Sequence, residues 1–332
     1  MDESLDTASY HYADPGIVWP SPRTFFGAPS CADIDQLVAQ VALLGIPFDG
    51  GTTYRTGQGV GPASARSASV IQLDAAWPGT GDHGATSGWF DIESGKDHLR
   101  GVTMADCGDV PIVPADIEGN FQRITRAVER IVQRGSLVVA VGGDHAISFP
   151  VGRGMRAHGK IDVVHFDAHA DFAEAFFGSR YTHGTNLRRL SELDFVSSIA
   201  AIGLRNVWRD EFDDLVGYGA RYATSKDILE RGATAVVEEV VPRSENIYVS
   251  IDIDVLDLPL VPGTTLPEPG GLPYRALREA LAAVATRGRV VGFDIVELNP
   301  PYDAAQATAR ITTWLIVHFL SSIFDSPSVA ET

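Results

Sequence analysis

Aspartate and histidine side chains, which can bind divalent metal ions, gather in three short segments of this sequence. The segments read Gly-Gly-Asp-His (142–145), Asp-Ala-His-Ala-Asp (167–171) and Asp-Ile-Asp (252–254). They contain Asp144, His145, Asp167, His169, Asp171, Asp252 and Asp254. Carboxylate and imidazole without thiolate form a hard-to-borderline ligand set, which suits Mn²⁺ and also accepts Ni²⁺, Co²⁺, Fe²⁺ or Zn²⁺. The residue types therefore predict a site for such metals.

The number of these side chains favours two ions over one. Each motif alone is weak evidence, because an Asp-x-Asp pair often begins a solvated loop or caps a helix. Gathered in one place, however, the carboxylates would repel one another strongly without cations. Six ligands are too many for one catalytic ion with open positions, whereas two ions that share bridging carboxylates fit better. We therefore expect a binuclear centre.

Strands and helices that alternate along the chain would bring the three segments together. Apolar, β-branched runs typical of strands lie at 41–47, 136–143, 161–169, 197–204, 246–254 and 289–297. Segments with helical apolar spacing lie at 119–134, 146–158, 273–287 and 303–324. This alternation predicts one α/β domain with a parallel sheet covered by helices on both faces. Open sheets of this kind bind ligands at the carboxyl ends of the strands, where the metal motifs fall.

Side-chain alternation offers a local reason for the ligands to converge. Successive side chains of an extended chain point to opposite faces, so alternate ones share a face. Asp167, His169 and Asp171 have this spacing, and Asp252 and Asp254 repeat it. We therefore expect each set to point at one place from the end of an extended strand.

The overall charge limits the partners of the protein. The 332 residues carry a net charge of −17, with 45% hydrophobic and 21% charged residues. An acidic surface repels phosphate backbones and anionic lipid, so nucleic acid and membrane partners are not expected. It favours the approach of a small cation, although acidity can also serve solubility alone.

Two cysteines and a polar N-terminus indicate a reducing compartment, and we expect a cytoplasmic protein. Cys31 and Cys107 form no disulfide framework. The first residues lack the basic start and apolar stretch of a signal peptide. Ile311–Phe324 is the most apolar late segment, but it is short and contains polar residues. It is therefore interpreted as a buried helix and not as a membrane span.

The predicted domain organisation is simple. Residues 1–38 are rich in proline, glycine and aromatics without a helical period, and are interpreted as an N-terminal arm. Residues 39–325 form a single catalytic domain, and residues 326–332 a C-terminal tail. Within the domain, 77–97 is predicted to be a long loop because it contains many glycines.

From about residue 45 onward, the sequence resembles the ureohydrolase family of arginases, agmatinases and related guanidino-hydrolases. The matching segments lie at 45–66, 106–110, 142–148, 165–172, 182–189, 250–271 and 293–303. The resemblance implies a three-layer α/β/α sandwich with a central, mostly parallel sheet, usually assembled into trimers or hexamers. It also implies hydrolysis of a guanidino C–N bond to give urea and an amine or ammonia.

The resemblance further implies a role for each matching residue. One ion would be bound by His145, Asp167, Asp171 and Asp252, and the other by Asp167, His169, Asp252 and Asp254. Asp167 and Asp252 would bridge the two ions, with Mn²⁺ the first choice and Ni²⁺ the alternative. His183 would shuttle protons, with a surface loop histidine as the competing interpretation. Glu297 would pair with the substrate guanidinium, with a strand-end salt bridge as the competing interpretation. Asp171 could relay a proton to the leaving nitrogen.

The substrate is less well defined. The segment THGTNLRR (182–189) resembles agmatinases and not arginases, which disfavours free arginine. Where the family usually has Thr-Gly-Thr-Pro, this chain has Thr264-Thr265-Leu266-Pro267. With Thr264 and Leu266 placed at the substrate, Leu266 makes the pocket more apolar and Thr265 makes it smaller. Guanidine, an N-alkylated guanidine or a biguanide therefore remains an alternative to agmatine, and neutral drift with repacking is the competing explanation.

Three other functions are alternatives to guanidine hydrolysis for this sequence. A non-catalytic partner subunit of an active paralogue would keep the fold, but all six ligand positions are filled. A deacetylase-like enzyme shares the sandwich but uses one zinc ion. A polyamine-binding protein needs no six-ligand cluster. We expect a homo-oligomer, and a hetero-oligomer with a paralogue is the alternative.

Overall fold

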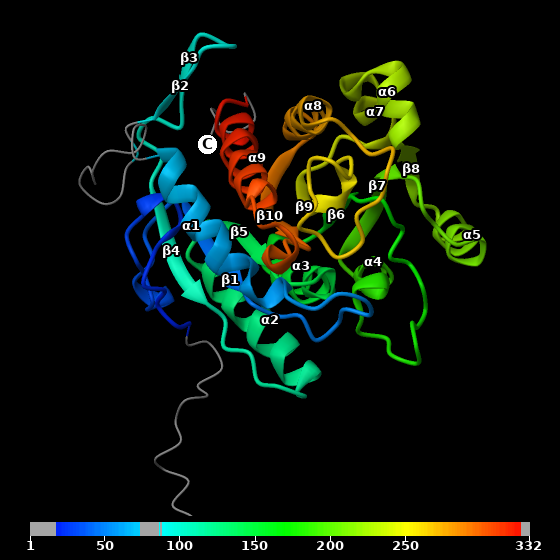
Figure 1. The fold of residues 1–332 in the computed structure, drawn as a ribbon, viewed down its shortest axis with the longest axis horizontal. Helices are drawn as coiled ribbons and strands as arrows, with labels where there is room; N and C mark the ends of the chain where they lie inside the picture. Colours follow the sequence, from blue (N-terminus) through cyan, green and yellow to red (C-terminus); the bar gives the residue numbers. More distant parts are fainter. Residues whose placement is uncertain (1–17, 74–85, 87, 327–332) are drawn as a thin grey trace, which may run out of the picture.

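The computed structural model describes residues 18–73, 86 and 88–326 (Figure 1). Its centre is an eight-stranded sheet in which all neighbouring strands run parallel, in the order β4-β1-β5-β10-β9-β6-β7-β8. The strands are β1 (Val41–Ile46), β4 (Met104–Asp109), β5 (Leu137–Gly142), β6 (Ile161–Phe166), β7 (Val196–Leu204), β8 (Arg221–Thr224), β9 (Asn246–Asp252) and β10 (Arg289–Val296). All residues of β1 and β9 are buried, as strands covered on both faces require.

Helices cover both faces of the sheet. They are α1 (Gly61–Leu73), α2 (Ile117–Gln133), α3 (Ser148–Gly154), α4 (Asn186–Ser191), α5 (Arg209–Tyr218), α6 (Ser225–Arg231), α7 (Ala233–Val240), α8 (Tyr274–Ala285) and α9 (Ala307–Phe324). Leu43 of β1 belongs to the core shared with α1 and α6–α9, whereas its neighbour Leu44 belongs to the core shared with α2–α5. In Figure 1, α8 and α9 lie toward the top of the view and α2 toward the bottom. The expected α/β/α sandwich is confirmed.

The predicted elements were all found, but the sequence missed others. The unpredicted strands β4 and β8 form the two edges of the sheet, where polar residues break up the apolar run. The segment 77–97, predicted as a loop, lies partly outside the described residues. Its described part contains a hairpin of β2 (Trp89–Asp91) and β3 (Lys96–His98), which corrects that prediction. The turn is closed by Gly95, whose φ of +67° favours glycine and whose N–H donates to the carbonyl of Asp91.

Helix α9 contains the apolar segment Ile311–Phe324, and it begins at Ala307 within the predicted helical segment 303–324. By length and composition alone its 18 residues could cross a membrane. However, 61% of this stretch is buried inside the fold, where α9 packs against α1 and α8. The interpretation as a buried helix therefore agrees with its surroundings.

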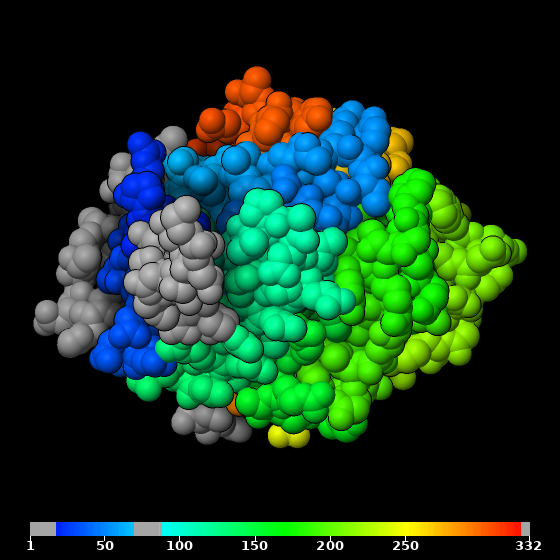
Figure 2. Space-filling view, turned by 90° about the horizontal axis from the view of Figure 1, so that it is seen from below, coloured from blue at the N-terminus to red at the C-terminus, as the bar shows by residue number. Residues whose placement is uncertain are grey.

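A buried ion pair joins helix α1 to strand β4, near the N-terminal end of the described chain. Arg66 of α1 donates to Asp106 (2.8 Å) and Asp109 (2.6 Å) of β4, and its side chain is only 1% exposed. Its guanidinium lies 4.3 Å from the ring centroid of Phe25, and Asp106 also accepts from the Phe25 N–H. The dark blue segment around Phe25 lies on the side of the molecule opposite the yellow-green α5 (Figure 2).

We expect Arg66→Met to lower the free energy of unfolding by about 3–5 kcal/mol, because it leaves two partly or fully buried carboxylates without their cation. Arg100→Met is the matched control, because Arg100 is 70% exposed and its pairing with Asp97 contributes at most about 1 kcal/mol. Urea titration measures both. Equal losses for the two variants would contradict this view of the ion pair.

Candidate metal centre and active-site pocket

The predicted site residues lie at the carboxyl ends of β5, β10, β9 and β6, which are neighbours in the sheet. His145 begins a short 3-10 helix after β5, Asp167 follows β6, Asp252 ends β9 and Glu297 follows β10. His183 comes from the loop between β6 and α4, in a 3-10 turn, His183–Thr185. The structure thus places these candidate side chains at one edge of the sheet, where the sequence analysis expected them.

The ligands converge through local turns and not through the alternation of side chains along a strand. This corrects the expected reason for their convergence. Strand β6 ends at Phe166, and Asp254 lies in a 3-10 helix, Ile253–Val255. Three aspartates instead fold the chain back on itself by accepting the N–H two residues ahead: Asp144 from Ala146 (3.0 Å), Asp167 from His169 (2.7 Å) and Asp252 from Asp254 (2.8 Å). Such Asx turns are local, and they begin at the first aspartate of each motif.

Asp171 reaches the site through a further backbone turn. Its φ of +49° lies in the left-handed region, which costs a non-glycine residue free energy. Its carbonyl accepts from the N–H of Leu187, and its carboxylate from the amide of Asn186 at 2.6 Å. These bonds to α4 hold Asp171 in place against the strain.

The first candidate ligand group surrounds Nδ1 of His145. This atom lies 3.1 Å from Asp167 Oδ2, 3.0 Å from Asp171 Oδ2 and 3.1 Å from Asp252 Oδ2. On the far side of the ring, Nε2 lies 2.9 Å from Ser250 Oγ, which in turn donates to Asp294. A partner for Nε2 orients the ring and turns Nδ1 toward the carboxylates.

The second candidate group surrounds Nδ1 of His169, which lies 3.2 Å from Asp167 Oδ1 and 3.3 Å from Asp254 Oδ2. Asp167 therefore turns one oxygen toward each histidine. All six predicted ligands are brought together in this way. His165 also lies here, stacked on His145 and 3.0 Å from Asp167 Oδ2. His165 was not among the predicted ligands, although its spacing from Asp167 and His169 would place it on the same face of an extended strand.

These side chains fit divalent cations. His145 Nδ1 and Asp167 Oδ2 are buried, and neither has a hydrogen-bond partner among the described residues. Burial, with the charges of Asp254 and Asp167, holds the pKa of Asp252 well above its ordinary value. Burial also raises the pKa of Asp254. Cations between the two groups would satisfy the orphaned atoms and neutralise the carboxylates.

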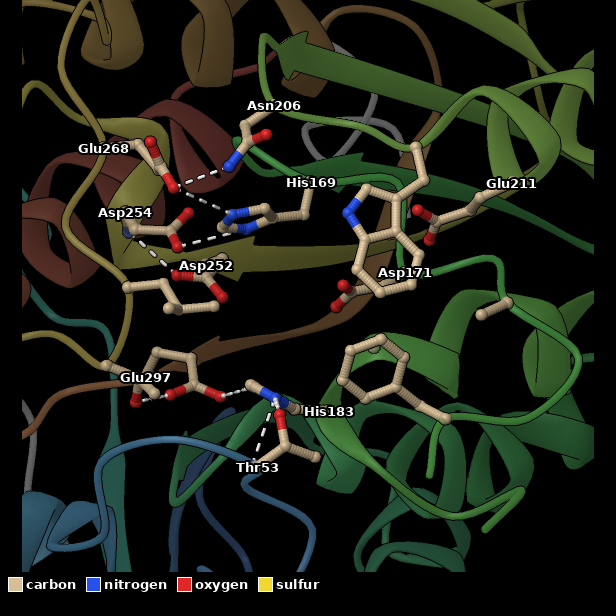
Figure 3. Close-up of a pocket in the computed structure, with 16 residues that line it drawn as sticks. Thr53, His169, Asp171, His183, Asn206, Glu211, Asp252, Asp254, Glu268 and Glu297 are labelled. Atoms are coloured by element: carbon tan, nitrogen blue, oxygen red, sulfur yellow. Dashed lines mark hydrogen bonds and ion pairs between the residues drawn. The ribbon is translucent and has the colours of Figure 1, made fainter. Parts of the chain in front are cut away.

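A cavity of about 160 Å³ opens onto this cluster (Figure 3). Its floor is formed by candidate ligands that include Asp171, Asp252 and His169, and its walls include His183 and Glu297. Further lining residues are Thr53, Ala173, Phe176, Gly184, Asn206, Trp208, Glu211, Thr265, Leu266 and Glu268. A small molecule in the cavity would therefore touch both the metal ligands and Glu297.

Nδ1 of His183 lies 3.4 Å from Oε1 of Glu297, and both side chains line the cavity (Figure 3). Burial disfavours the imidazolium, but the contact with Glu297 outweighs it and raises the pKa of His183 to about 9. Burial likewise disfavours the carboxylate, but His183 and a hydrogen bond from Thr265 hold the pKa of Glu297 below its ordinary value. The second ring nitrogen of His183 lies 2.7 Å from the hydroxyl of Thr53.

The loop before Pro267 is arranged differently from the sequence-based expectation. Leu266 lines the cavity as expected. Thr264 does not line it: this side chain is fully buried, and its hydroxyl has no partner among the described residues. Thr265 lines the cavity instead and donates to Glu297. The register of the loop, which decides which threonine faces the substrate, is not encoded in a periodic pattern.

Comparison with known proteins supports the same conclusion. The Arginase family matches residues 39–321, and the chain belongs to this family. A guanidinopropionase of Pseudomonas aeruginosa is 32% identical over 91% of this chain and 92% of its own length. An agmatinase of Bacillus anthracis is 30% identical over 81% of this chain and 87% of its own length. The solved proclavaminate amidino hydrolase of Streptomyces clavuligerus has a TM-score of 0.76 at 29% identity, covering 94% of this chain and 99% of that one.

This family assignment confirms the resemblance found in the sequence. The chain is an arginase-family hydrolase of guanidino C–N bonds. Enzymes of this family use a binuclear divalent metal centre, and the histidine–aspartate cluster is present here. Family members are typically oligomeric.

We expect the purified protein to bind two divalent ions per chain and to be stabilised by them, because the folded state alone assembles the ligands. His145→Ala and His169→Ala should each lose about one ion, and Asp167→Asn should weaken both sites. Elemental analysis after dialysis and thermal melts with Mn²⁺ measure these effects. His158→Ala, between α3 and β6, is the control, and equal metal loss in it would refute the ligand assignment.

Proposed function

We propose that this protein is an agmatinase-like enzyme that hydrolyses the guanidino group of a small cationic guanidine compound to urea and an amine or ammonia. The observation that supports this is the convergence of Glu297, a carboxylate outside both ligand groups, on the cavity above them. Its two ions would be held by His145, Asp167, Asp171 and Asp252, and by Asp167, His169, Asp252 and Asp254. Mn²⁺ is the first choice and Ni²⁺ the alternative.

The uncatalysed hydrolysis is slow because a guanidinium is resonance-stabilised and poorly electrophilic. Two dications bound there would lower the pKa of water, so that hydroxide would be available at neutral pH. Glu297 forms charge-assisted hydrogen bonds to the planar cation and orients its carbon toward the ligand groups. Asp171 lines the cavity, and its carboxylate would pass the proton of the attacking hydroxide to the leaving nitrogen. His183, whose ring lies beside the hydroxyl of Thr53, would exchange other protons between the site and solvent.

The charge of the cavity favours a cationic substrate over a guanidino acid. Among the described residues that line it, none is a lysine or an arginine, whereas Glu211 and Glu268 add carboxylates outside the metal cluster. The amide of Asn206 donates to Glu268 at 2.7 Å. A substrate carboxylate would meet no lysine or arginine in this lining and would be repelled by Glu268 and by the ionised fraction of Glu211, whose pKa burial raises to about 7. Although a guanidinopropionase and a guanidinobutyrase are among the relatives, we therefore favour a substrate with a positive or neutral tail.

A second candidate substrate is guanidine itself, an N-alkylated guanidine or a biguanide such as dimethylbiguanide. Leu266 supports it, because this side chain lines the cavity and cannot form hydrogen bonds there. Ala173, Phe176 and Trp208 extend the apolar lining, with the two aromatic ring centroids 5.2 Å apart. Such a wall suits short alkyl groups.

The remaining proposals concern the setting of the enzyme. We place it in the cytoplasm, as a trimer or hexamer of identical chains built from one catalytic domain, residues 39–325. A hetero-oligomer with a paralogue is the alternative. A non-catalytic partner role is disfavoured because both ligand groups are complete.

Three guanidines of similar length test the charge argument: agmatine, butylguanidine and 4-guanidinobutyrate, with positive, neutral and negative tails. We expect kcat/KM for 4-guanidinobutyrate to be at least about 100-fold below that of the better of the other two, because like charges face each other without a counterion. Urea release with Mn²⁺ and with Ni²⁺ measures this. Guanidine and dimethylbiguanide complete the panel, and a clear preference for agmatine over them would remove the special meaning of Leu266. A preference for 4-guanidinobutyrate would contradict the charge argument.

His183→Ala and Glu297→Ala should each lower kcat/KM by about 100-fold or more while the protein keeps its two ions, because neither side chain is a ligand. Glu297→Gln keeps the shape of the side chain and removes its charge, so it separates charge from packing. Urea release and elemental analysis on the same samples measure both effects. Full activity in His183→Ala or Glu297→Ala would refute the assigned role.

A further inference from the structure

Glu297 is held by more donors than a residue that only awaits a substrate would need. Its Oε1 accepts from the backbone N–H of His145 at 2.8 Å and faces His183 at 3.4 Å. Its Oε2 accepts from the amide of Gln58 at 3.1 Å and from the hydroxyl of Thr265. Two groups therefore contact each oxygen of the Glu297 carboxylate, which leaves little room for a further donor.

Gln58 and Thr265 form one unit on the Oε2 side. Gln58 lies at the start of a 3-10 helix, Gln58–Val60, just before α1, and it is fully buried. Its amide nitrogen donates to the carbonyl of Arg55 at 2.8 Å and contacts both the Thr265 hydroxyl and Glu297. Thr265 is 1% exposed and lines the cavity. Two loops distant in sequence therefore meet on one oxygen of Glu297.

The backbone of Glu297 is strained, and the surrounding hydrogen bonds hold it in this conformation. Its φ of +64° lies in the left-handed region, where a glutamate is strained. Strained residues at functional sites persist when their surroundings fix them from several sides. The N–H of Glu297 donates to Gly143, and its side chain is fixed by His145, Thr265 and Gln58.

We infer that Gln58 and Thr265 are positioning residues that hold the Glu297 carboxylate and determine how it receives the guanidinium. This inference rests on the proposed function. The Oε2 side is closed by buried donors, whereas the Oε1 side faces His183, whose contact is the longest of the four. The substrate N–H groups bind on the Oε1 side, in exchange with His183. The methyl group of Thr265 limits the space beside the bound cation.

Thr265→Val tests this positioning role, because valine keeps the volume of threonine and lacks the hydroxyl. For the best substrate of the panel, we expect KM to rise and kcat to fall, with kcat/KM lower by about tenfold to a hundredfold. Thr265→Ser retains the donor and should stay within about threefold of the wild type. A merely structural defect would lower the active fraction, and hence kcat, with KM unchanged. Metal content and thermal melts identify variants that have failed to fold.

A double-mutant cycle with Gln58→Leu tests whether the two residues act together. Because both act on one oxygen of Glu297, the loss in kcat/KM of the double variant should be close to the larger single loss, and not their product. Thr265→Gly and Thr265→Val both lack the hydroxyl, and the glycine variant leaves more space beside the cation. The glycine variant should therefore raise kcat/KM for dimethylbiguanide relative to guanidine, compared with the valine variant.

The outcomes distinguish failure of the proposed function from failure of the positioning inference. If the wild type with both ions releases urea from none of the guanidines, the proposed function fails. If the wild type is active and Thr265→Val keeps its KM, or if the cycle shows independent losses, the positioning inference fails while the function stands.

Discussion

The site depends on one electrostatic constraint: four buried aspartates cannot all stay ionised side by side without cations. Asp167, Asp252 and Asp254 are each at most 3% exposed, and Asp171 is 7% exposed. His145 Nδ1, among three of these carboxylates, is left without a hydrogen bond. An arrangement that is unfavourable in the empty protein becomes favourable when metal binds, so ligand geometry and metal affinity are two aspects of the same free energy.

The parallel sheet makes this concentration of charge possible. The core strands β5, β10, β9 and β6 are mostly apolar and mostly buried on both faces, and their buried polar residues include His165, Ser250 and Asp294. The hydrophobic free energy of this core fixes where the strands end. The polar residues then come after the strands, where Asx turns and 3-10 helices direct them inward. Most of the charged site is thus separated from the hydrophobic core along each strand, and the buried polar residues within the strands pack behind the ligands, as Ser250 does behind His145.

The same separation explains what the sequence could predict. The ligand types and the edge of the sheet followed from motifs that lie next to apolar runs, whereas the roles proposed for His183 and Glu297 were implied by the family resemblance. The geometry of Asp171 did not, because its left-handed backbone is determined by contacts with Asn186 and Leu187. The positioning role of Gln58 could not be predicted, because it depends on a contact with Thr265, which lies more than 200 residues away in the sequence. The choice of Thr265 over Thr264 is likewise set by how a loop packs.

Crowding of the Glu297 carboxylate links substrate binding to proton transfer. With two groups in contact with each of its oxygens, a guanidinium can bind the carboxylate closely only if one of these groups moves away. The backbone of His145 and the buried pair of Gln58 and Thr265 cannot leave without breaking the loop packing. His183 can, because it is at the cavity wall with a longer contact and has Thr53 as a second partner. Under the proposed function, arrival of the substrate would free His183 from its ion pair at the stage when a proton carrier is needed. Loss of the Glu297 contact would also remove the cause that holds its pKa near 9, which would make the imidazolium a better proton donor.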